Sequence, residues 1–304
     1  MIVGLGLVAP FFVYILAGVV AEKLLRHSAE GQKWLDAFVF YIALPALLFQ
    51  SVRTLPDGTS DIVGFLILTT MATGLMFLFG WGVGRFAKSG DHAAVYGLSA
   101  SYSNIGYMGP TLTVAVLGPT AGAPAAFIFC ADVLLIFSIW PAMIRAEGFS
   151  VRGLVGSLGK VIQHPFILAT LAGLVFAASG LTMPDFINTP LDGFRNAAAP
   201  AALFSLGLTL SRRTANHLEI PLSVCLVGKL VLHPLLVAGL FVIFGGFDPI
   251  WIATAIIMGG LPPAANVYVM ARAEGISTEL AARAVFFGTA LSAVTLPVII
   301  AILG

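Results

Sequence analysis

The sequence predicts an all-α polytopic membrane protein, with ten transmembrane helices in a 5+5 inverted repeat and both termini outside. The first observation is composition: 59% of the 304 residues are hydrophobic and 10% are charged, and the mean hydropathy is +1.01. Such a chain cannot cover a soluble domain with polar side chains. The second is a series of long apolar runs, and the third is a pair of helix breaks at matching places in the two halves. The formal net charge of +1 and the lack of a basic tract give no sign of a nucleic-acid partner.

Ten apolar runs approach the length of a membrane span, for which about 17 to 25 residues are needed. The first run has no basic segment before it, so it predicts a span and not a cleaved signal peptide. Cys130 and Cys225 both fall inside predicted spans, which argues against a disulfide framework. The predicted spans are Ile2–Ala21, Leu35–Val52, Ile62–Phe86, Ala93–Leu117, Pro124–Ile144, Pro165–Ser179, Asn196–Leu210, Ile220–Phe244, Pro249–Ala271 and Leu280–Leu303.

The fourth and ninth spans contain sequences that break a helix. Segment 101–110 holds Gly106, Gly109 and Pro110 together with an asparagine and hydroxyl side chains, and segment 258–268 holds Pro262 and Pro263 after two glycines. Proline lacks an N–H and clashes with the preceding turn, and glycine weakens a helix. Irregular backbone at membrane depth survives only against protein or a water-filled cavity. Two interrupted helices in corresponding places of two halves indicate a transporter binding site.

The distribution of Lys and Arg predicts the orientation. One set of alternate loops holds twelve basic residues, whereas the opposite loops hold only Arg53 and Arg195. By the positive-inside rule the first set is cytoplasmic, which places both termini outside and favours an even number of spans. The twelve residues are Lys23, Arg26, Lys33, Arg85, Lys88, Arg145, Arg152, Lys160, Arg212, Arg213, Arg272 and Arg283.

The two halves share motifs at similar spacing. Pro-Ala-Leu-Leu-Phe at 45–49 is echoed by Pro-Ala-Ala-Leu-Phe at 200–204. The first proline of this motif precedes the proline of the helix break by 65 residues in one half and by 62 in the other. Five spans in each copy is an odd number, so two tandem copies insert with opposite topology. We interpret residues 1–147 and 160–304 as two five-helix repeats, with chance similarity in low-diversity apolar sequence as the alternative.

Two crossing broken helices predict a site for an anion. Each half-helix presents unpaired N–H groups and the positive end of its dipole near the crossing. The alternative is that the asparagines only satisfy backbone groups freed by glycine and proline, and that the tyrosines fill helix interfaces. The residues predicted to contact a substrate are Asn104, Tyr107, Gly109, Pro110, Pro262, Pro263, Asn266, Tyr268 and Lys229.

Two ionisable residues lie deep in predicted spans. Asp132 is roughly 12 Å from the outer end of the fifth span and Lys229 is roughly 14 Å from the cytoplasmic end of the eighth, at 1.5 Å per residue. A charge at this depth costs several kcal/mol unless it is paired or hydrated, which makes both residues functional candidates. Lys229 is expected to face an anionic substrate or to pair with Asp132, and Asp132 to carry a coupling proton. A static ion pair, or a carboxylate capping a helix end, is the structural alternative. His233, one turn after Lys229, is expected to be packed or to mark a kink.

These motifs resemble the auxin efflux carrier family, including its bacterial malonate-transporter-like members. The resemblance covers nearly the whole chain. It rests on Asn-Ile-Gly-Tyr-Met-Gly-Pro at 104–110, Phe-Tyr-Ile-Ala-Leu-Pro-Ala-Leu at 40–47, Leu-Phe-Ser-Leu-Gly at 203–207, Lys229 followed by Pro234, and Leu261-Pro262 with Asn266-Val267-Tyr268.

The resemblance implies the fold of the bile acid:sodium symporter superfamily. In that fold spans 1, 2, 6 and 7, here about 1–55 and 160–213, form a scaffold. Spans 3–5 and 8–10, here about 60–147 and 218–304, form a core that moves like an elevator. The sodium sites of the bile acid transporters use an acidic residue near the second crossing, and this sequence has none between Asp248 and Glu274. Proton coupling or facilitated diffusion is therefore expected.

The sequence thus predicts a carrier of small organic anions, carboxylates such as malonate, malate or auxin-like acids, in a bacterial inner membrane. A sodium-coupled anion symporter is the alternative within transport, and a channel or an intramembrane enzyme are distant alternatives. The chain has no metalloprotease or serine-hydrolase motif, and no cofactor or metal is expected. Membrane lipid, protons and a second copy bound through the scaffold are the expected partners.

Overall fold

The computed structural model describes residues 2–25, 29–54, 61–87, 93–144, 163–211 and 217–303, and every regular element in these ranges is a helix. Two of them, η1 and η4, are π-turns within longer helices, and η3 is a 3₁₀ turn. The elements are α1 (Ile2–Leu25), α2 (Ala29–Phe38), η1 (Val39–Ala43), α3 (Leu44–Val52), α4 (Ile62–Phe86), α5 (Ala93–Ser101), α6 (Gly109–Leu117), η3 (Pro119–Ala121), α7 (Gly122–Ile144), α9 (Pro165–Ser179), α10 (Asp185–Ser211), α11 (Ile220–Val227), η4 (Gly228–Leu232), α12 (His233–Phe244), α13 (Pro249–Gly260), α14 (Ala265–Ala273) and α15 (Thr278–Leu303).

Several helices have the length and composition of membrane spans. Among the described residues, five helical segments are long and apolar enough, and α9 and α13 are shorter apolar helices. The outer face of α4 shows the pattern directly, because Val63, Ile67, Met71, Leu75 and Leu78 are all exposed. Residues at this spacing form one stripe along a helix, and a continuous apolar stripe suits lipid and not water.

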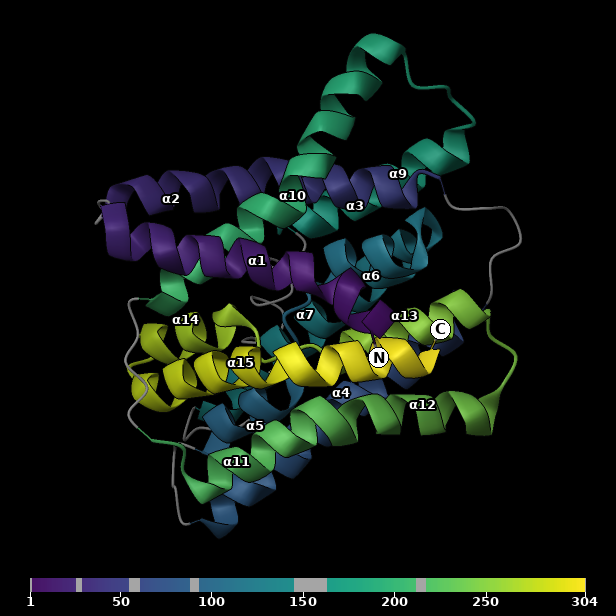
Figure 1. Ribbon diagram of the computed structural model, residues 1–304. Coiled ribbons are helices and arrows are strands. Elements are labelled where there is room, and N and C mark those ends of the chain that lie inside the picture. Colours follow the sequence, from purple (N-terminus) through teal and green to yellow (C-terminus); the bar gives the residue numbers. More distant parts are fainter. Residues whose placement is uncertain are drawn as a thin grey trace.

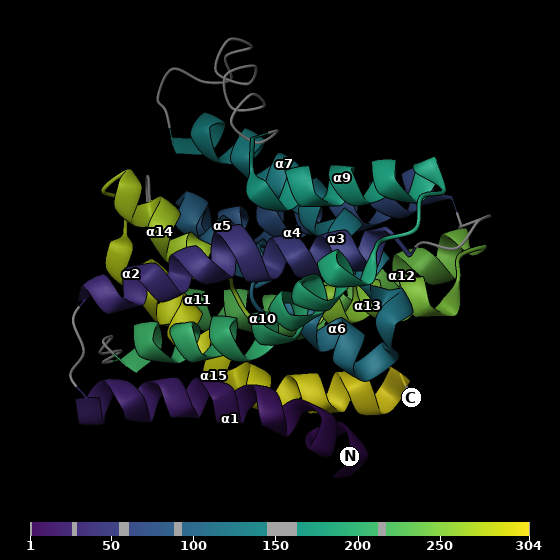
Figure 2. The same cartoon turned by 90° about the horizontal axis from the view of Figure 1, so that it is seen from above.

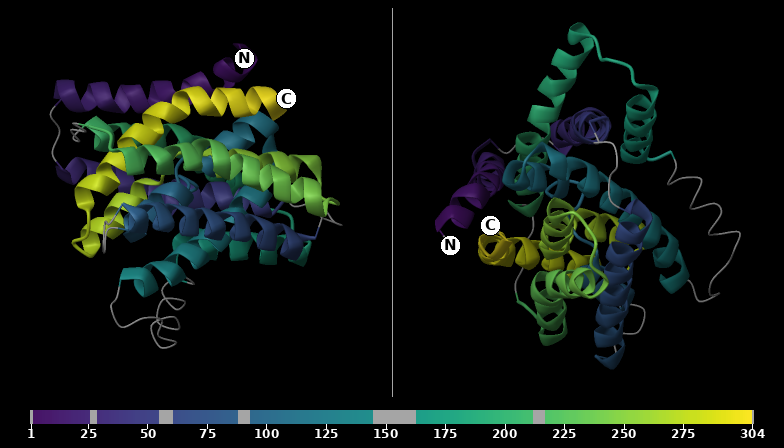
Figure 3. Two further views of the ribbon diagram at one scale, coloured as in Figure 1. Left: turned by 90° about the horizontal axis from the view of Figure 1, so that it is seen from below. Right: turned by 90° about the vertical axis from the view of Figure 1, so that its right-hand side faces the viewer.

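The helices form two groups that pack side by side. Figure 1 shows α1, α2, α3, α9 and α10 in the upper part and α4, α5 and α11–α15 in the lower part, with α6 and α7 between them. Figures 2 and 3 show that the long helices of both groups run in roughly the same direction. The grouping matches extensive packing of α1 on α10 and of α3 on α9 in one part, and of α4 on α5 and α12 on α13 in the other.

The helix is interrupted at both places where the sequence predicts a break. The first lies between α5 and α6, and the second between α13 and α14. The predicted start of the seventh span at Asn196 is wrong, because α10 begins at Asp185 and continues through Pro190 and Pro200. The polar residues in the first half of α10 lower its hydropathy, so the apolar run underestimates the helix.

The predicted orientation and the ten-span count stay predictions. Part of their basis is a set of basic residues that lies outside the described residues. These are Arg26, Lys88, Arg145, Arg152, Lys160, Arg212 and Arg213.

The contact between α1 and α10 depends on a glycine from each helix. A Cβ at Gly18 would overlap the backbone of Phe204, and a Cβ at Gly207 would overlap the backbone of Ile15. Backbone atoms cannot move aside as the end of a flexible side chain can. Small residues at such positions let transmembrane helices approach closely.

We expect Gly207→Ala to destabilise the protein by about 1–3 kcal/mol, because the added methyl group overpacks this contact. Gly239→Ala in α12 is the matched control, since no atom lies within 4 Å of the added carbon and alanine favours a helix by about 0.5–1 kcal/mol over glycine. Thermal unfolding in detergent measures both. A melting temperature for Gly207→Ala at or above that of Gly239→Ala would contradict the assignment.

Candidate functional site

The two helix breaks lie against each other and are joined by backbone hydrogen bonds. Ser103 and Pro263 form an antiparallel bridge. The N–H of Asn104 donates to the carbonyl oxygen of Pro262 at 2.8 Å, and the N–H of Ala264 donates to the carbonyl oxygen of Tyr102 at 2.9 Å. Backbone groups that leave a helix in an apolar interior must find such partners. Each break therefore supplies the partners that the other needs.

Four of the predicted site residues pack within this crossing. Gly109, Pro110, Pro262 and Pro263 are all buried. A Cβ at Gly109 would lie 2.6 Å from the Met258 sulfur, so only glycine fits without a shift of that side chain. These residues shape the backbone, and none of them lines the cavity that contains Tyr107.

Asn104 holds the turn that leads into α6, whose N-cap is Met108. The backbone carbonyl of Asn104 accepts from the N–H groups of Met108 and Gly109, both at 3.1 Å, and its side-chain oxygen accepts from the N–H of Tyr107 at 3.4 Å. The side chain is 1% exposed, and its amide nitrogen has no hydrogen-bond partner among the described residues. The role that the sequence left as an alternative, in which Asn104 satisfies freed backbone groups, is thus present, and one buried donor is left over.

The second half-helix has an open N-terminus. The N–H groups of Ala265 and Asn266, at the start of α14, have no acceptor among the described residues. Unpaired N–H groups carry the positive end of the helix dipole. The N-terminus of α14 is therefore a place where an anionic ligand could be bound.

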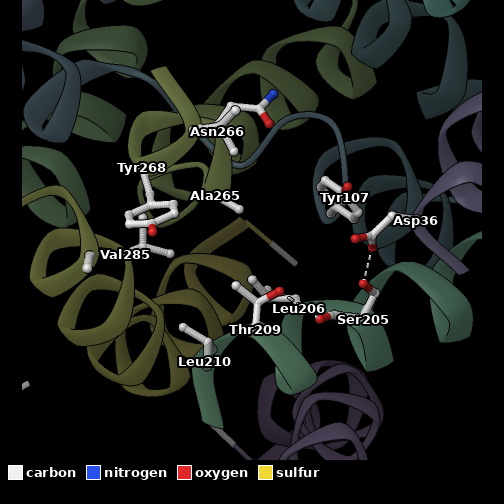
Figure 4. A pocket seen from close by; sticks show the side chains of 12 residues that line it. Asp36, Tyr107, Ser205, Leu206, Thr209, Leu210, Ala265, Asn266, Tyr268 and Val285 are labelled. Carbon is white, nitrogen blue, oxygen red and sulfur yellow. Dashed lines mark hydrogen bonds between the residues drawn. The ribbon is translucent and has the colours of Figure 1, made fainter. Parts of the chain in front are cut away.

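A cavity of about 210 Å³ borders this N-terminus (Figure 4). It lies between the two groups of helices, with α2 and α10 on one side and the residues following both breaks on the other. Three predicted site residues, Tyr107, Asn266 and Tyr268, belong to its wall. The lining residues are Asp36, Tyr107, Ser205, Leu206, Thr209, Leu210, Ala265, Asn266, Tyr268, Val269, Ala282 and Val285.

The wall of this cavity contains a carboxyl group that the sequence reasoning missed. Asp36 accepts a hydrogen bond from the hydroxyl group of Ser205, and Figure 4 shows it beside Tyr107. No Lys or Arg is among the described residues that line the cavity. Asp36 is the second residue of the predicted span Leu35–Val52. The contact between an aspartate and a serine of a distant span cannot be predicted from the residues around either one.

Lys229 lies elsewhere, fully buried behind the crossing. It belongs to the π-turn η4, and its ammonium group donates to the carbonyl oxygen of Gly259 and lies 3.1 Å from His233 Nδ1. Gly259 is in the last turn of α13, where carbonyl groups lack helical partners and a cation is favoured. Lys229 thus compensates the C-terminal end of the half-helix whose continuation is α14.

Asp132 faces the same region from α7 and is 2% exposed. Its Oδ1 atom has no hydrogen-bond partner among the described residues. Asp132, His233, Ser103 and Gly259 line a cavity of about 10 Å³, close to the space of one water molecule, and Thr73 lines the same small cavity. The ion pairs between described residues do not include one between Asp132 and Lys229. The structure brings the two residues to one cluster without direct contact.

A double-mutant cycle tests the electrostatic coupling within this cluster. We expect Lys229→Met to destabilise the protein by about 1–3 kcal/mol, because the carbonyl of Gly259 loses its donor. Asp132→Asn together with Lys229→Met is expected to cost less than the sum of the two single changes, since the double variant leaves no uncompensated charge. Thermal unfolding in detergent is the measurement. Strict additivity would show that the two charges do not interact.

Known proteins resemble the chain over nearly its whole length. A family model described as membrane transport protein matches residues 3–154 and 151–300. A Rhizobium meliloti protein named "Putative malonate transporter" is 36% identical over 95% of this chain and 92% of that protein. An uncharacterised transporter of Methanothermobacter thermautotrophicus is 26% identical over 95% of both chains. The lysosomal cholesterol signaling protein of Mus musculus is 25% identical over 93% of this chain, which corresponds to 35% of that larger protein.

Proposed function

This chain belongs to the membrane transport protein family, the auxin efflux carrier family that its motifs indicate, and from this premise we propose that it carries small organic anions across the membrane. It is a multi-pass membrane transporter and not an enzyme. The proposed substrates are carboxylates such as malonate or malate. The name of the Rhizobium meliloti relative supports this class, and a bacterial inner membrane is the proposed location.

The observation that carries this proposal is the cavity at the N-terminus of α14. The N–H groups at this N-terminus and the hydroxyl group of Tyr107 are donors suited to a carboxylate. The hydroxyl protons of Ser205 and Thr209 are already donated to Asp36 and to the carbonyl oxygen of Ser205. Asn104 contributes by holding the first break in place and not by lining the cavity. Lys229 supports the crossing from the opposite side of α13.

Asp36 favours a proton-coupled mechanism. An ionised carboxyl group in the wall repels an incoming anion, because two like charges at short range disfavour each other. A proton that enters with the substrate removes this repulsion. Asp36 and Asp132 are the candidate carriers, Asp36 beside the substrate and Asp132 behind the crossing. The sodium-coupled alternative has less support, because the second crossing contains no acidic side chain.

The arrangement of the cavity supports an elevator-type movement. We assign α1, α2, α3, α9 and α10 to a scaffold and the remaining helices to a mobile core, and the substrate cavity lies between the two. The two five-helix repeats, residues 1–147 and 160–304, receive support from the two family-model matches, which divide the chain at nearly the same place. A homodimer formed through the scaffold remains part of the proposal.

Uptake into proteoliposomes tests the function. Labelled malonate, malate and an aromatic carboxylate are each supplied under an imposed pH gradient or sodium gradient. We expect saturable uptake of at least one dicarboxylate that responds to the pH gradient and not to sodium. Asp132→Asn is expected to abolish accumulation against a gradient while downhill flux continues, because a neutral amide carries no coupling proton. Sodium-driven uptake would contradict proton coupling, and flux that does not saturate would indicate a channel.

Tyr107 provides a test of the cavity itself. We expect Tyr107→Phe to raise the KM for the transported carboxylate about five- to tenfold, since one hydrogen bond to a charged ligand is worth about 1–1.5 kcal/mol. Tyr41→Phe is the control, because Tyr41 is 66% exposed on the outer surface of η1. Initial rates of uptake at varied substrate concentration measure both. An unchanged KM for Tyr107→Phe would place the substrate elsewhere.

A further inference from the structure

A second cavity, of about 300 Å³, lies at the opposite end of α10 from the Tyr107 cavity. Its wall combines the end of α3 with Arg195 from the first half of α10, and the turn η3 with the start of α7 on the other side. Most of the side chains that line it are polar. The lining residues include Gln50, Arg53, Thr54, Thr120, Ala123 and Arg195.

We propose that this cavity is an anion-binding site that captures the carboxylate substrate at the outer end of the transport path. Its two arginines are the only basic residues in the loops predicted to face outside. By contrast, no Lys or Arg in the described part of the chain lines the Tyr107 cavity. The identity of the ligand as a transported carboxylate rests on the proposed function, whereas the existence of an anion site does not.

The guanidinium group of Arg53 has N–H donors that can bind a ligand. A guanidinium group has five N–H donors in a planar fork. Two of its nitrogens have partners among the described residues, since Nε donates to Gln50 Oε1 and Nη2 donates to Asn188 Oδ1 at 2.6 Å. The remaining N–H groups can bind a carboxylate. The two bonds on one edge fix the plane of the group, which makes its geometry specific.

Arg195 is held only loosely by its acidic neighbour. Its Nη1 atom lies 3.9 Å from Asp192 Oδ1, well beyond the roughly 2.7–2.9 Å of a charge-assisted hydrogen bond. Asp192 is occupied instead by Gln50, which donates at 3.0 Å, and by Asn188, which donates at 3.3 Å. The positive charge of Arg195 is therefore available to the cavity.

A network of hydrogen bonds holds the polar side chains of this cavity in place. Gln50 is 2% exposed, and its amide group connects Arg53 on α3 to Asn188 and Asp192 on α10. Asn188, Asp192 and Arg195 follow one face of α10 at helical spacing. On the other side, Ala123 places the first turn of α7 in the wall, and the positive end of that helix adds to the field of the two arginines.

The location gives the site a role in transport. The two arginines belong to the proposed scaffold, and Thr120 and Ala123 belong to the proposed core. The site therefore spans the same boundary as the Tyr107 cavity, at the other end of α10. Movement of the core past the scaffold would alter it, so it suits transient capture and not tight storage. A small dicarboxylate can present one carboxylate to each arginine.

The test combines binding and transport with malonate as the probe. Equilibrium binding to the purified protein in detergent is measured at constant ionic strength, and uptake and efflux are measured separately in vesicles of known orientation. We expect Arg53→Gln with Arg195→Gln to weaken malonate binding at this site at least about tenfold, because bonds to charged groups are lost. The KM is expected to rise on the outer side only. Labelling of Arg53→Cys by an impermeant maleimide identifies that side.

Two further variants keep the test decisive. Arg53→Lys with Arg195→Lys retains both charges but not the planar fork, and intermediate binding is expected. Arg85→Gln removes one exposed charge from α4 and is expected to change nothing. Malonate binding that requires the arginines without transport would overturn the carrier function and leave the anion site intact. Wild-type transport with unchanged binding and KM in the double Gln variant would overturn the anion site and leave the carrier function intact.

Discussion

The structure depends on the mutual hydrogen bonding of two broken helices. A break in an apolar interior exposes N–H and C=O groups that cost several kcal/mol each if they stay unpaired. The short antiparallel contact between Ser103 and Pro263 solves this for both breaks at once. Neither break is stable without the other, so the two halves of the chain must assemble around this point. This arrangement requires the buried prolines and glycines that interrupt the two helices.

The four helix ends at the crossing differ in how their backbone N–H and C=O groups are hydrogen-bonded. The turn that leads into α6 is held by Asn104, and the C-terminal end of α13 is compensated by Lys229. At the end of α5, the carbonyl of Leu98 accepts from the N–H of Tyr102, and that of Gly97 accepts from the hydroxyl group of Ser101. At the N-terminus of α14, the N–H groups of Ala265 and Asn266 have no backbone acceptor among the described residues, and this end borders the cavity. The polarity of the cavity therefore depends on which helix ends find hydrogen-bond partners within the protein.

The sequence was sufficient for the positions of both breaks and for the burial of Asp132 and Lys229, because proline, glycine and deep charges leave strong local signals. It was insufficient for contacts that depend on helix rotation. Asp36 and Ser205 meet across two distant helices, and neither residue is unusual in its own segment. The same reason applies to Lys229, which was expected to face an anionic substrate or to pair with Asp132: its hydrogen bond to the carbonyl oxygen of Gly259 could not be predicted from the sequence. The start of α10 was missed because polar residues there serve the Arg53 network and lower the hydropathy.

The two cavities together constrain how an anion can cross. The Arg53 cavity offers charge through Arg53 and Arg195, whereas the Tyr107 cavity offers neutral donors and a carboxyl group. An anion that moved as a free ion from the first to the second would lose its cationic partners and approach Asp36. A proton is the simplest compensation, because it neutralises either Asp36 or one carboxylate of the substrate. In the proposed mechanism, charge attracts the substrate at the Arg53 cavity, and proton uptake makes its release from the arginines and its passage beside Asp36 energetically possible.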